Sequence, residues 1–278
     1  MSSSMPNKVG AQIKEGSDLY YATLYLNKEI RNQACLIEML RREVCHIPES
    51  CSEPDIARAK LAWWMEEFKR TKECLSRHPL TKALTLNELS RAHLMDVLLA
   101  LTAGTFEDVT AKTFFDRAAV TKHLRHLNAD LVSLMAQLFE IYSSDEIDLI
   151  LNLACAVERS NAILGLRDHR NSPTLYFCES DMAACGLTPQ SIRSSRSSSE
   201  LERFLEGQIT IVKSDLISTL SQLSRNLRKR GKFFTTQAEI NLQVLDLALK
   251  KNCHVLENRM ELLPIRKLWL AWKLKNWG

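Results

Sequence analysis

Glycine and proline are scarce in this sequence, which has 8 glycines and 7 prolines among its 278 residues. A protein of many short strands needs turns at close intervals, and these two residues supply most turns, so their scarcity favours helices. The sequence also has no Gly-x-Gly-x-x-Gly or Gly-x-x-x-x-Gly-Lys stretch, the loops that cradle phosphates in nucleotide-binding folds. A nucleotide-binding α/β fold is therefore disfavoured.

Long apolar runs are absent as well. No stretch of about 18 consecutive apolar residues occurs, so no membrane-spanning helix is expected. The opening stretch "MSSSMPNKVGAQIKEGSD" lacks the apolar core of a signal peptide. Acidic Glu15 and Asp18 come early, and no arginine precedes Arg31, which argues against a mitochondrial presequence. We expect a cytoplasmic protein, bacterial rather than organellar, with membrane association left open.

The eight cysteines include no Cys-x-x-Cys pair, and several fall on apolar helical faces. This usage is typical of small buried hydrophobic residues in a reducing compartment. A structural zinc site needs four ligands, and the nearest candidates, Cys45, His46 and Cys51, form an incomplete set. No bound metal is predicted from these residues.

The net charge of +4 and the isoelectric point near 8.6 are only mildly basic. Cations are spread along the chain, apart from one run that contains Arg225, Arg228, Lys229, Arg230 and Lys232. A nucleic-acid-binding protein usually concentrates its cations on a denser face. No nucleic-acid partner is predicted.

Apolar residues recur at spacings of three and four in almost every segment after Asp18, which predicts helices. Ser52 is the expected N-cap of one of them. The polar stretch "SIRSSRSSSE" at 191–200 predicts a mobile surface loop. Because no long linker divides the chain, we expect one all-α domain over 18–278, after a disordered or irregular segment over 1–17. The predicted helices cover residues 32–46, 52–77, 87–102, 107–115, 117–140, 145–166, 199–226, 235–252 and 256–274.

The C-terminal stretch "IRKLWLAWKLKNWG" interleaves tryptophans with lysines and an arginine. Such a helix can lie in a membrane interface, with its rings in the apolar layer and its cations near anionic headgroups. The favoured alternative is a closing helix that packs its tryptophans on the protein body and extends its lysines into solvent.

Several stretches, taken in order, resemble the squalene and phytoene synthase family across nearly the whole chain. "DLYYATLYLNKEIRNQACLIEMLRREV" is similar to the family's opening, which leads into its first aspartate motif. "ARAKLAWWMEEF" and "HPLTKAL" are similar to the next helix and its His-Pro turn. "ERSNAILGLRDHRNSPTLYFCESDMAACGLTP" is similar to the second motif helix, the loop after it and a Gly-Leu-Thr turn.

The resemblance implies a single-domain isoprenoid synthase-like helical bundle around a central cavity. Two Asp-x-x-x-Asp motifs face each other across this cavity in the family. Residues four apart point the same way on a helix, so each motif presents two carboxylates to Mg²⁺. The metal ions neutralise the diphosphate leaving group while an allylic cation forms in an apolar pocket.

This sequence departs from the family at both motifs. Counting on from Val44, the first motif falls on Cys45 to Glu49, with one carboxylate where the family has two or three. Counting back from Tyr176, the second falls on Gly165 to His169, and neither outer position is acidic. Cysteine and histidine are softer ligands than Mg²⁺ prefers. Half of the expected negative charge is missing, although Glu38, Glu43 or Glu158 could take over.

The residues expected at the cavity form two groups. The degenerate motif positions are Cys45, His46, Glu49, Asn161, Gly165, Asp168 and His169. The candidates for binding phosphate are Arg31, Arg42, Arg167 and Arg170. Side chains of the kind that line a prenyl tunnel, or that equally fill a core, are Leu40, Val44, Leu134, Leu138 and Leu164.

The leading hypothesis is a catalytically degenerate family member that binds an isoprenoid or another lipid, or a protein partner, and needs no cofactor. A non-catalytic branch of the family, a mitochondrial assembly factor for respiratory complex I, has a similar ending to "ELLPIRKLWLAWKLKNWG". The alternative is an active Mg²⁺-dependent prenyltransferase that condenses two isoprenyl diphosphates, favoured if three carboxylates converge on the cavity. A third hypothesis is a helical scaffold with a filled centre.

Overall fold

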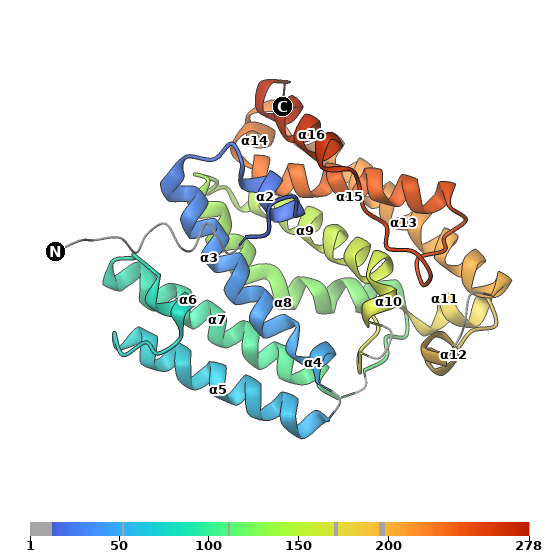
Figure 1. The fold of residues 1–278 in the computed structure, drawn as a ribbon, viewed down its shortest axis with the longest axis horizontal. Coiled ribbons are helices and arrows are strands. Elements are labelled where there is room, and N and C mark those ends of the chain that lie inside the picture. Colours follow the sequence, from blue (N-terminus) through green and yellow to red (C-terminus); the bar gives the residue numbers. More distant parts are fainter. Residues whose placement is uncertain (1–12, 52, 111, 170–171, 195–197, 278) are drawn as a thin grey trace.

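The fold is that of a helical bundle, seen in a computed structural model (Figure 1). The structure describes residues 13–51, 53–110, 112–169, 172–194 and 198–277. Within these residues no strand forms, and Phe114 and Cys178 make one isolated parallel bridge. The predicted all-α fold class is therefore confirmed. The irregular segment predicted over 1–17 lies mostly outside the described residues.

Eight helices of 14 to 24 residues build the bundle. They are α3 (Lys28–Cys45), α5 (Pro54–Lys72), α7 (Glu88–Asp108), α8 (Arg117–Leu138), α9 (Ser144–Leu164), α13 (Ser199–Gln222), α15 (Lys232–Lys250) and α16 (Pro264–Trp277). Shorter helices connect them: α2 (Asp18–Thr23), α4 (Ile47–Ser50), α6 (Pro79–Lys82), α10 (Leu166–His169), α11 (Glu179–Ala184), α12 (Pro189–Ser194) and α14 (Arg225–Arg230).

Side-chain caps fix where several helices begin. The side-chain oxygens of Asn27, Asn87 and Asp116 each accept a hydrogen bond of 2.8 Å from the backbone N–H three residues later. Such a cap satisfies one of the backbone donors that the first turn leaves unpaired. Short polar residues ahead of apolar periodic stretches thus define the starts of α3, α7 and α8.

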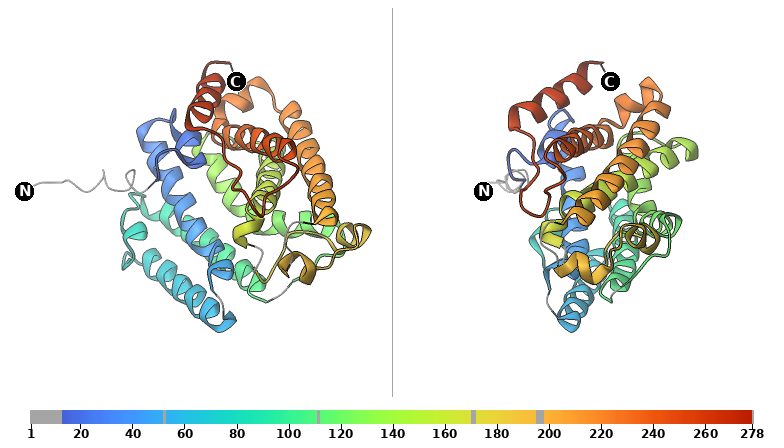
Figure 2. Two further views of the ribbon diagram at one scale, coloured as in Figure 1. Left: turned by 45° about the vertical axis from the view of Figure 1, so that its right-hand side comes forward. Right: turned by 90° about the vertical axis from the view of Figure 1, so that its right-hand side faces the viewer.

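Helix α9 lies in the middle of the bundle and packs against α8, α13 and α15 (Figures 1 and 2). Its Ile150 and Leu153 are fully buried, as expected for a helix with neighbours on several sides. Helices α3 and α5 both pack against α7, and these three helices form the other half of the bundle. Helices α7 and α8 cross closely at Gly104, where a Cβ would lie 2.6 Å from Leu127 Cδ2.

The predicted helix over 107–115 is wrong. Helix α7 continues to Asp108, and the residues described between it and Arg117 are not helical. The carbonyls of Phe114 and Phe115 accept hydrogen bonds from the N–H groups of Glu179 and Ser180, at 2.7 and 3.2 Å. Because these N–H groups belong to the first turn of α11, a tertiary contact draws this segment away from helical geometry.

Several helix bounds also differ from prediction. Helix α5 stops at Lys72 rather than at 77, because Cys74 takes a left-handed φ of 64° and the Leu75 N–H bonds back to the Arg70 carbonyl. Helix α16 starts at Pro264, a favoured first-turn residue, rather than at 256. Helix α12 occupies part of the predicted loop at 191–200, whose residues 195–197 lie outside the described residues, as does Ser52.

A buried carboxylate fastens α5 to α6. Glu67 is fully buried, and its Oε1 accepts hydrogen bonds from the backbone N–H groups of Arg77 and His78 and from the Thr81 hydroxyl, at 2.6 to 2.8 Å. Arg70 pairs with its Oε2 at 3.1 Å. Burial opposes ionisation, but these bonds outweigh it and lower the pKa of Glu67 to about 2.

We expect Glu67→Gln to lower the free energy of unfolding at pH 7 by on the order of 3 kcal/mol. The reason is that the ionised carboxylate of Glu67 makes the bonds to α6 and to Arg70. Because the pKa of Glu67 is lower in the folded than in the unfolded protein, its ionised form stabilises the fold at pH values above the usual glutamate pKa near 4.3. This contribution is lost as the pH falls to about 2. Urea titrations between pH 7 and 2 should show a smaller pH dependence in Glu67→Gln than in the parent. The control is Glu66→Gln, at an exposed neighbour; equal stability of the two variants would contradict the assignment.

Candidate functional site

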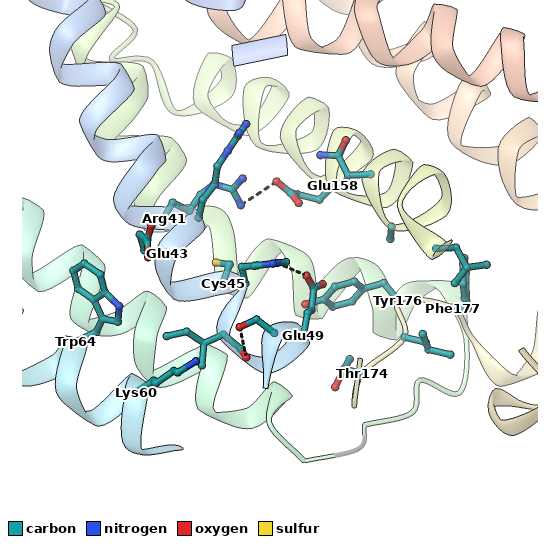
Figure 3. A pocket seen from close by; sticks show the side chains of 18 of the residues that line it. Arg41, Glu43, Cys45, Glu49, Lys60, Trp64, Glu158, Thr174, Tyr176 and Phe177 are labelled. Carbon is teal, nitrogen blue, oxygen red and sulfur yellow. Dashed lines mark hydrogen bonds and ion pairs between the residues drawn. The ribbon is translucent and has the colours of Figure 1, made fainter. Parts of the chain in front are cut away.

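A cavity of about 670 Å³ opens between α3, α4, α5, α9 and the segment 174–177 (Figure 3). Polar side chains lie mainly on α3, α4 and α9, and apolar side chains on α5 and the segment 174–177. The lining residues are Arg41, Arg42, Glu43, Cys45, His46, Ile47, Glu49, Ser50, Lys60, Trp63, Trp64, Glu158, Asn161, Ala162, Leu166, Thr174, Leu175, Tyr176 and Phe177.

The end of α3 supplies one wall. Arg41 and Cys45, four residues apart, share one helical face and both line the cavity. Helix α3 ends at Cys45, and Pro48 stands in the first turn of α4. This change of direction brings His46 and Glu49 to the same wall, where His46 Nδ1 lies 2.9 Å from Glu49 Oε2. The first degenerate motif therefore faces the cavity.

An ion-pair network crosses from α3 to α9. Arg41 makes two bonds of 2.8 Å to Glu38 and an ion pair of 3.1 Å to Glu158 (Figure 3). Arg42 Nε donates to Glu38 Oε1 at 2.8 Å. The Arg41 side chain is 16% exposed and that of Glu38 is 10% exposed, whereas that of Arg42 is 50% exposed. Arg41 is thus the largely buried centre of the network.

The ion-pair network and burial shift the pKa values of Glu38 and Cys45 in opposite directions. Burial opposes ionisation of Glu38, but Arg41 and Arg42 outweigh it and lower its pKa to about 2. Burial raises the pKa of the Cys45 thiol to about 11. Glu38 is therefore a carboxylate at neutral pH, while Cys45 is a thiol and not the thiolate that would bind a metal or attack a substrate.

A second polar group fixes the opposite wall. The Tyr176 hydroxyl donates to Asp108 Oδ2 at 3.0 Å, and His123 Nε2 lies 3.0 Å from Asp108 Oδ1. Asp108 and His123 are both buried. Burial, together with the charge of Asp108, raises the pKa of Tyr176 well above its usual value. The ring of Tyr176 is held in one orientation at the cavity as a neutral phenol.

The apolar part of the lining comes from aromatic and aliphatic side chains. Trp64 is 5% exposed and Phe177 is 3% exposed, so both are anchored in the core, while Trp63 is 44% exposed at the rim. Leu166 and Ala162 complete this surface from α10 and α9. The cavity therefore has a charged side and an apolar side, which matches an amphiphilic ligand.

The residues predicted from the sequence divide into those that line the cavity and those that do not. Cys45, His46, Glu49, Asn161 and Arg42 line it. Gly165 and Asp168 do not, and Asp168 is exposed on α10. The side chain of His169 and the whole of Arg170 lie outside the described part of the chain.

Two predicted arginines lie elsewhere. The guanidinium of Arg31 lies over the ring of Tyr20, 5.4 Å from its centroid. Arg167 is exposed, and its Nη1 donates to the Glu257 carbonyl at 3.4 Å. The second motif helix turns Glu158 toward the cavity together with the predicted Asn161, and Glu158 lies about two turns before Gly165.

Sequence reasoning missed Arg41 and Lys60. A signal for Arg41 was present, since Glu38 precedes two arginines at the spacings that permit ion pairs on a helix. None of Leu40, Val44, Leu134, Leu138 and Leu164 lines the cavity, and Leu40 and Val44 are completely buried. Of the two roles left open for these side chains, the structure therefore shows that they pack in or against the core.

The carboxylates at the cavity do not form a Mg²⁺ site. Three of them line it, but Glu158 is paired with Arg41 and Glu49 with His46, and Glu43 is the third. Among the described residues, no group of three or more His, Cys, Asp and Glu side chains is arranged to hold a metal ion. Mg²⁺ prefers several hard oxygen ligands around one point, which this set does not provide.

Comparisons with known proteins place this geometry in context. The sequence model of the squalene/phytoene synthase family matches residues 13–268. No curated protein matches the sequence significantly. A dehydrosqualene synthase in complex with ligand has a similar structure, with a TM-score of 0.76 and 14% identity over 98% of this chain and 95% of that chain.

Two further solved structures have the same fold. Squalene synthase HpnC from Alicyclobacillus acidocaldarius gives a TM-score of 0.66 at 15% identity, over 89% of this chain and 92% of that one. YisP from Bacillus subtilis gives 0.62 at 12% identity, over 96% and 94%. At these identities the structures establish the isoprenoid synthase fold alone, whereas the family model covers most of the chain. The chain belongs to the squalene/phytoene synthase family.

Proposed function

We propose that this chain is a catalytically degenerate member of the family that holds an isoprenoid or another lipid in its cavity without transferring it. The observation that carries the proposal is the position of Arg41. Its guanidinium lies between Glu38 on its own helix and Glu158 on α9, at 2.8 and 3.1 Å. An arginine of the chain therefore occupies Glu158, one of the three carboxylates that line the cavity.

The charge of the lining supports the same conclusion. Three cations, Arg41, Arg42 and Lys60, are matched by the three lining carboxylates. Family chemistry requires a strongly acidic site that concentrates several Mg²⁺ ions around a diphosphate. A charge-balanced lining neither attracts those ions nor compensates a bare diphosphate, so it favours a lipid with an uncharged or weakly charged polar end.

The shape of the cavity fits such a ligand. Its volume of about 670 Å³ lies within the range of about 300 to 1,000 Å³ that is typical of small-molecule sites. The apolar body of a lipid would lie on Trp64, Leu166 and Phe177, and its polar end would lie near Arg42, Lys60 or His46. An open cavity also counts against a scaffold with a filled centre.

An assembly-type role with a protein partner is compatible with this proposal, because a lipid-filled pocket can coexist with a docking function. The rival activity is Mg²⁺-dependent condensation of two isoprenyl diphosphates. It is favoured by one observation, the presence of Glu43, Glu49 and Glu158 at the cavity. Turnover measurements separate the two.

If Arg41 is the structural bridge of the site, Arg41→Gln should lower the free energy of unfolding by about 3 kcal/mol or more, because the partly buried Glu158 loses its arginine and the buried Glu38 keeps only the half-exposed Arg42. Arg42→Gln is the matched control, since Arg42 also pairs with Glu38 but is half exposed, and it should cost less than about 1 kcal/mol. Urea denaturation measures both. Similar small losses would show that the Arg41 bridge contributes little.

Ligand binding and turnover should separate in the parent protein. We expect calorimetric binding of farnesol or geranylgeraniol, and no pyrophosphate release from the corresponding diphosphates with Mg²⁺ or Mn²⁺. Ala162→Phe, which fills the cavity from α9, should abolish binding; Ala118→Phe, on the exposed start of α8, should not. Metal-dependent pyrophosphate release would establish the rival activity instead. A parent protein that binds neither alcohol would refute the lipid pocket.

A further inference from the structure

Helix α16 turns Trp269 and Trp272 away from the protein body. Trp269 is 50% exposed and Trp272 is 43% exposed, while Lys267 is only 5% exposed. The packing predicted for this stretch, with buried tryptophans and solvated lysines, is therefore wrong for Trp269, Trp272 and Lys267, whereas Lys273 and Lys275 are exposed as predicted. The physical reason is the ion pair of 2.6 Å between Lys267 Nζ and Asp18 Oδ1, with a further hydrogen bond of 3.2 Å to the Gly16 carbonyl.

This ion pair fixes the rotation of the helix about its axis. Lys267, Leu270 and Ala271 are buried together against the body, where α16 packs on α15 and α2. At about 100° per residue, four large apolar side chains then fall within an arc of about 100° on the opposite side. These side chains, called the outer apolar face below, are Ile265, Leu268, Trp269 and Trp272, which are 37% to 70% exposed.

Cations flank the outer apolar face on both sides. On the same helical wheel, Arg266 and Lys273 fall beside one edge and Lys275 beside the other. Lys273 Nζ lies 5.5 Å from the centroid of the Trp269 ring, and Lys275 Nζ lies 4.8 Å from that of Tyr25. The helix itself contains no acidic residue.

The cationic surface continues beyond α16. Lys232, whose Nζ donates to the Tyr25 carbonyl at 2.8 Å, has its pKa lowered by burial and by the nearby cations Lys275 and Lys229. Acidic side chains near the ends of α16 are already paired: Asp18 with Lys267, and Glu261 with Arg259 at 2.6 Å. The charge on this side of the molecule is therefore complementary to an anionic surface.

We infer that α16 is a docking helix for an anionic bilayer surface, lying in the interface with its outer apolar face in the acyl boundary and its cations at the headgroups. An apolar arc that includes tryptophan, flanked by cations, is the arrangement of helices that lie on membranes. No helix in the described ranges is long and apolar enough to cross a bilayer, so contact takes place at the surface. Helix α16 lies at one outer edge of the molecule, where a flat surface can reach it (Figures 1 and 2).

Vesicle binding of the full chain tests this inference. The probes are phosphatidylcholine vesicles with and without phosphatidylglycerol, scored by co-sedimentation at low and high salt. We expect the parent protein to bind the anionic vesicles more tightly, with salt weakening the difference. Ile265→Ser combined with Trp269→Ser should lower affinity by at least about tenfold, because two apolar side chains no longer enter the bilayer. Arg266→Gln combined with Lys273→Gln should remove much of the preference for anionic vesicles.

Matched variants distinguish binding through the outer apolar face from non-specific adsorption by other exposed apolar side chains and from effects of the cavity. Leu89→Ser combined with Phe115→Ser removes two side chains that are 82% and 77% exposed on other elements, and should leave binding unchanged. Ala162→Phe should also bind vesicles normally, so failure of the cavity proposal and failure of this one are distinguishable. Thermal unfolding checks that each variant is folded.

Any one of the following results would overturn the inference. The first is a parent protein that binds neither kind of vesicle. The second is undiminished binding of the Ile265→Ser, Trp269→Ser protein, or loss of binding in Ala162→Phe. The third is a concentration-dependent dimer, seen by analytical ultracentrifugation, that this double variant abolishes while vesicle binding persists, because a second copy of the chain would then cover the face.

Discussion

The site depends on one guanidinium placed between two carboxylates. Arg41 joins α3 to α9 through Glu158 and is held at its base by Glu38. Removing charged groups from water is costly unless each is paired and hydrogen-bonded. Arg41, Glu38 and Glu158 therefore hold one another in position. Arg41 thus places a cation from the chain itself between carboxylates of two neighbouring helices.

The consequences of this pairing reach the rest of the cavity. The cavity combines a polar side, on which three cations accompany three carboxylates, with an apolar side anchored by Trp64 and Phe177. The buried Asp108 holds Tyr176 from behind, so the opposite wall is equally fixed. Such a cavity is suited to holding an amphiphile, while stabilising a departing diphosphate demands a strong and asymmetric field.

A second ion pair has a comparable role at the other end of the molecule. Lys267 is drawn into the body by Asp18, and the periodicity of the helix then forces Trp269 and Ile265 outward. Tryptophans that could have been core residues become part of the surface because one lysine occupies the buried side. The proposed lipid cavity thus follows from the position of Arg41, and the proposed bilayer contact from the position of Lys267.

Local patterns in the sequence determined the helices, because periodic apolar residues and short polar caps act within a few neighbours: α8 and α9 begin and end within two residues of prediction. The order of the motifs also indicated the family, and the sequence alone showed that Cys45 and Gly165 stand where the family motifs have aspartates. Tertiary structure alone decided the rest. It replaced the helix over 107–115 with a segment tied to α11, turned Glu158 rather than Asp168 toward the cavity, and chose the face of α16. Each outcome depends on a partner distant in sequence, which periodicity does not encode.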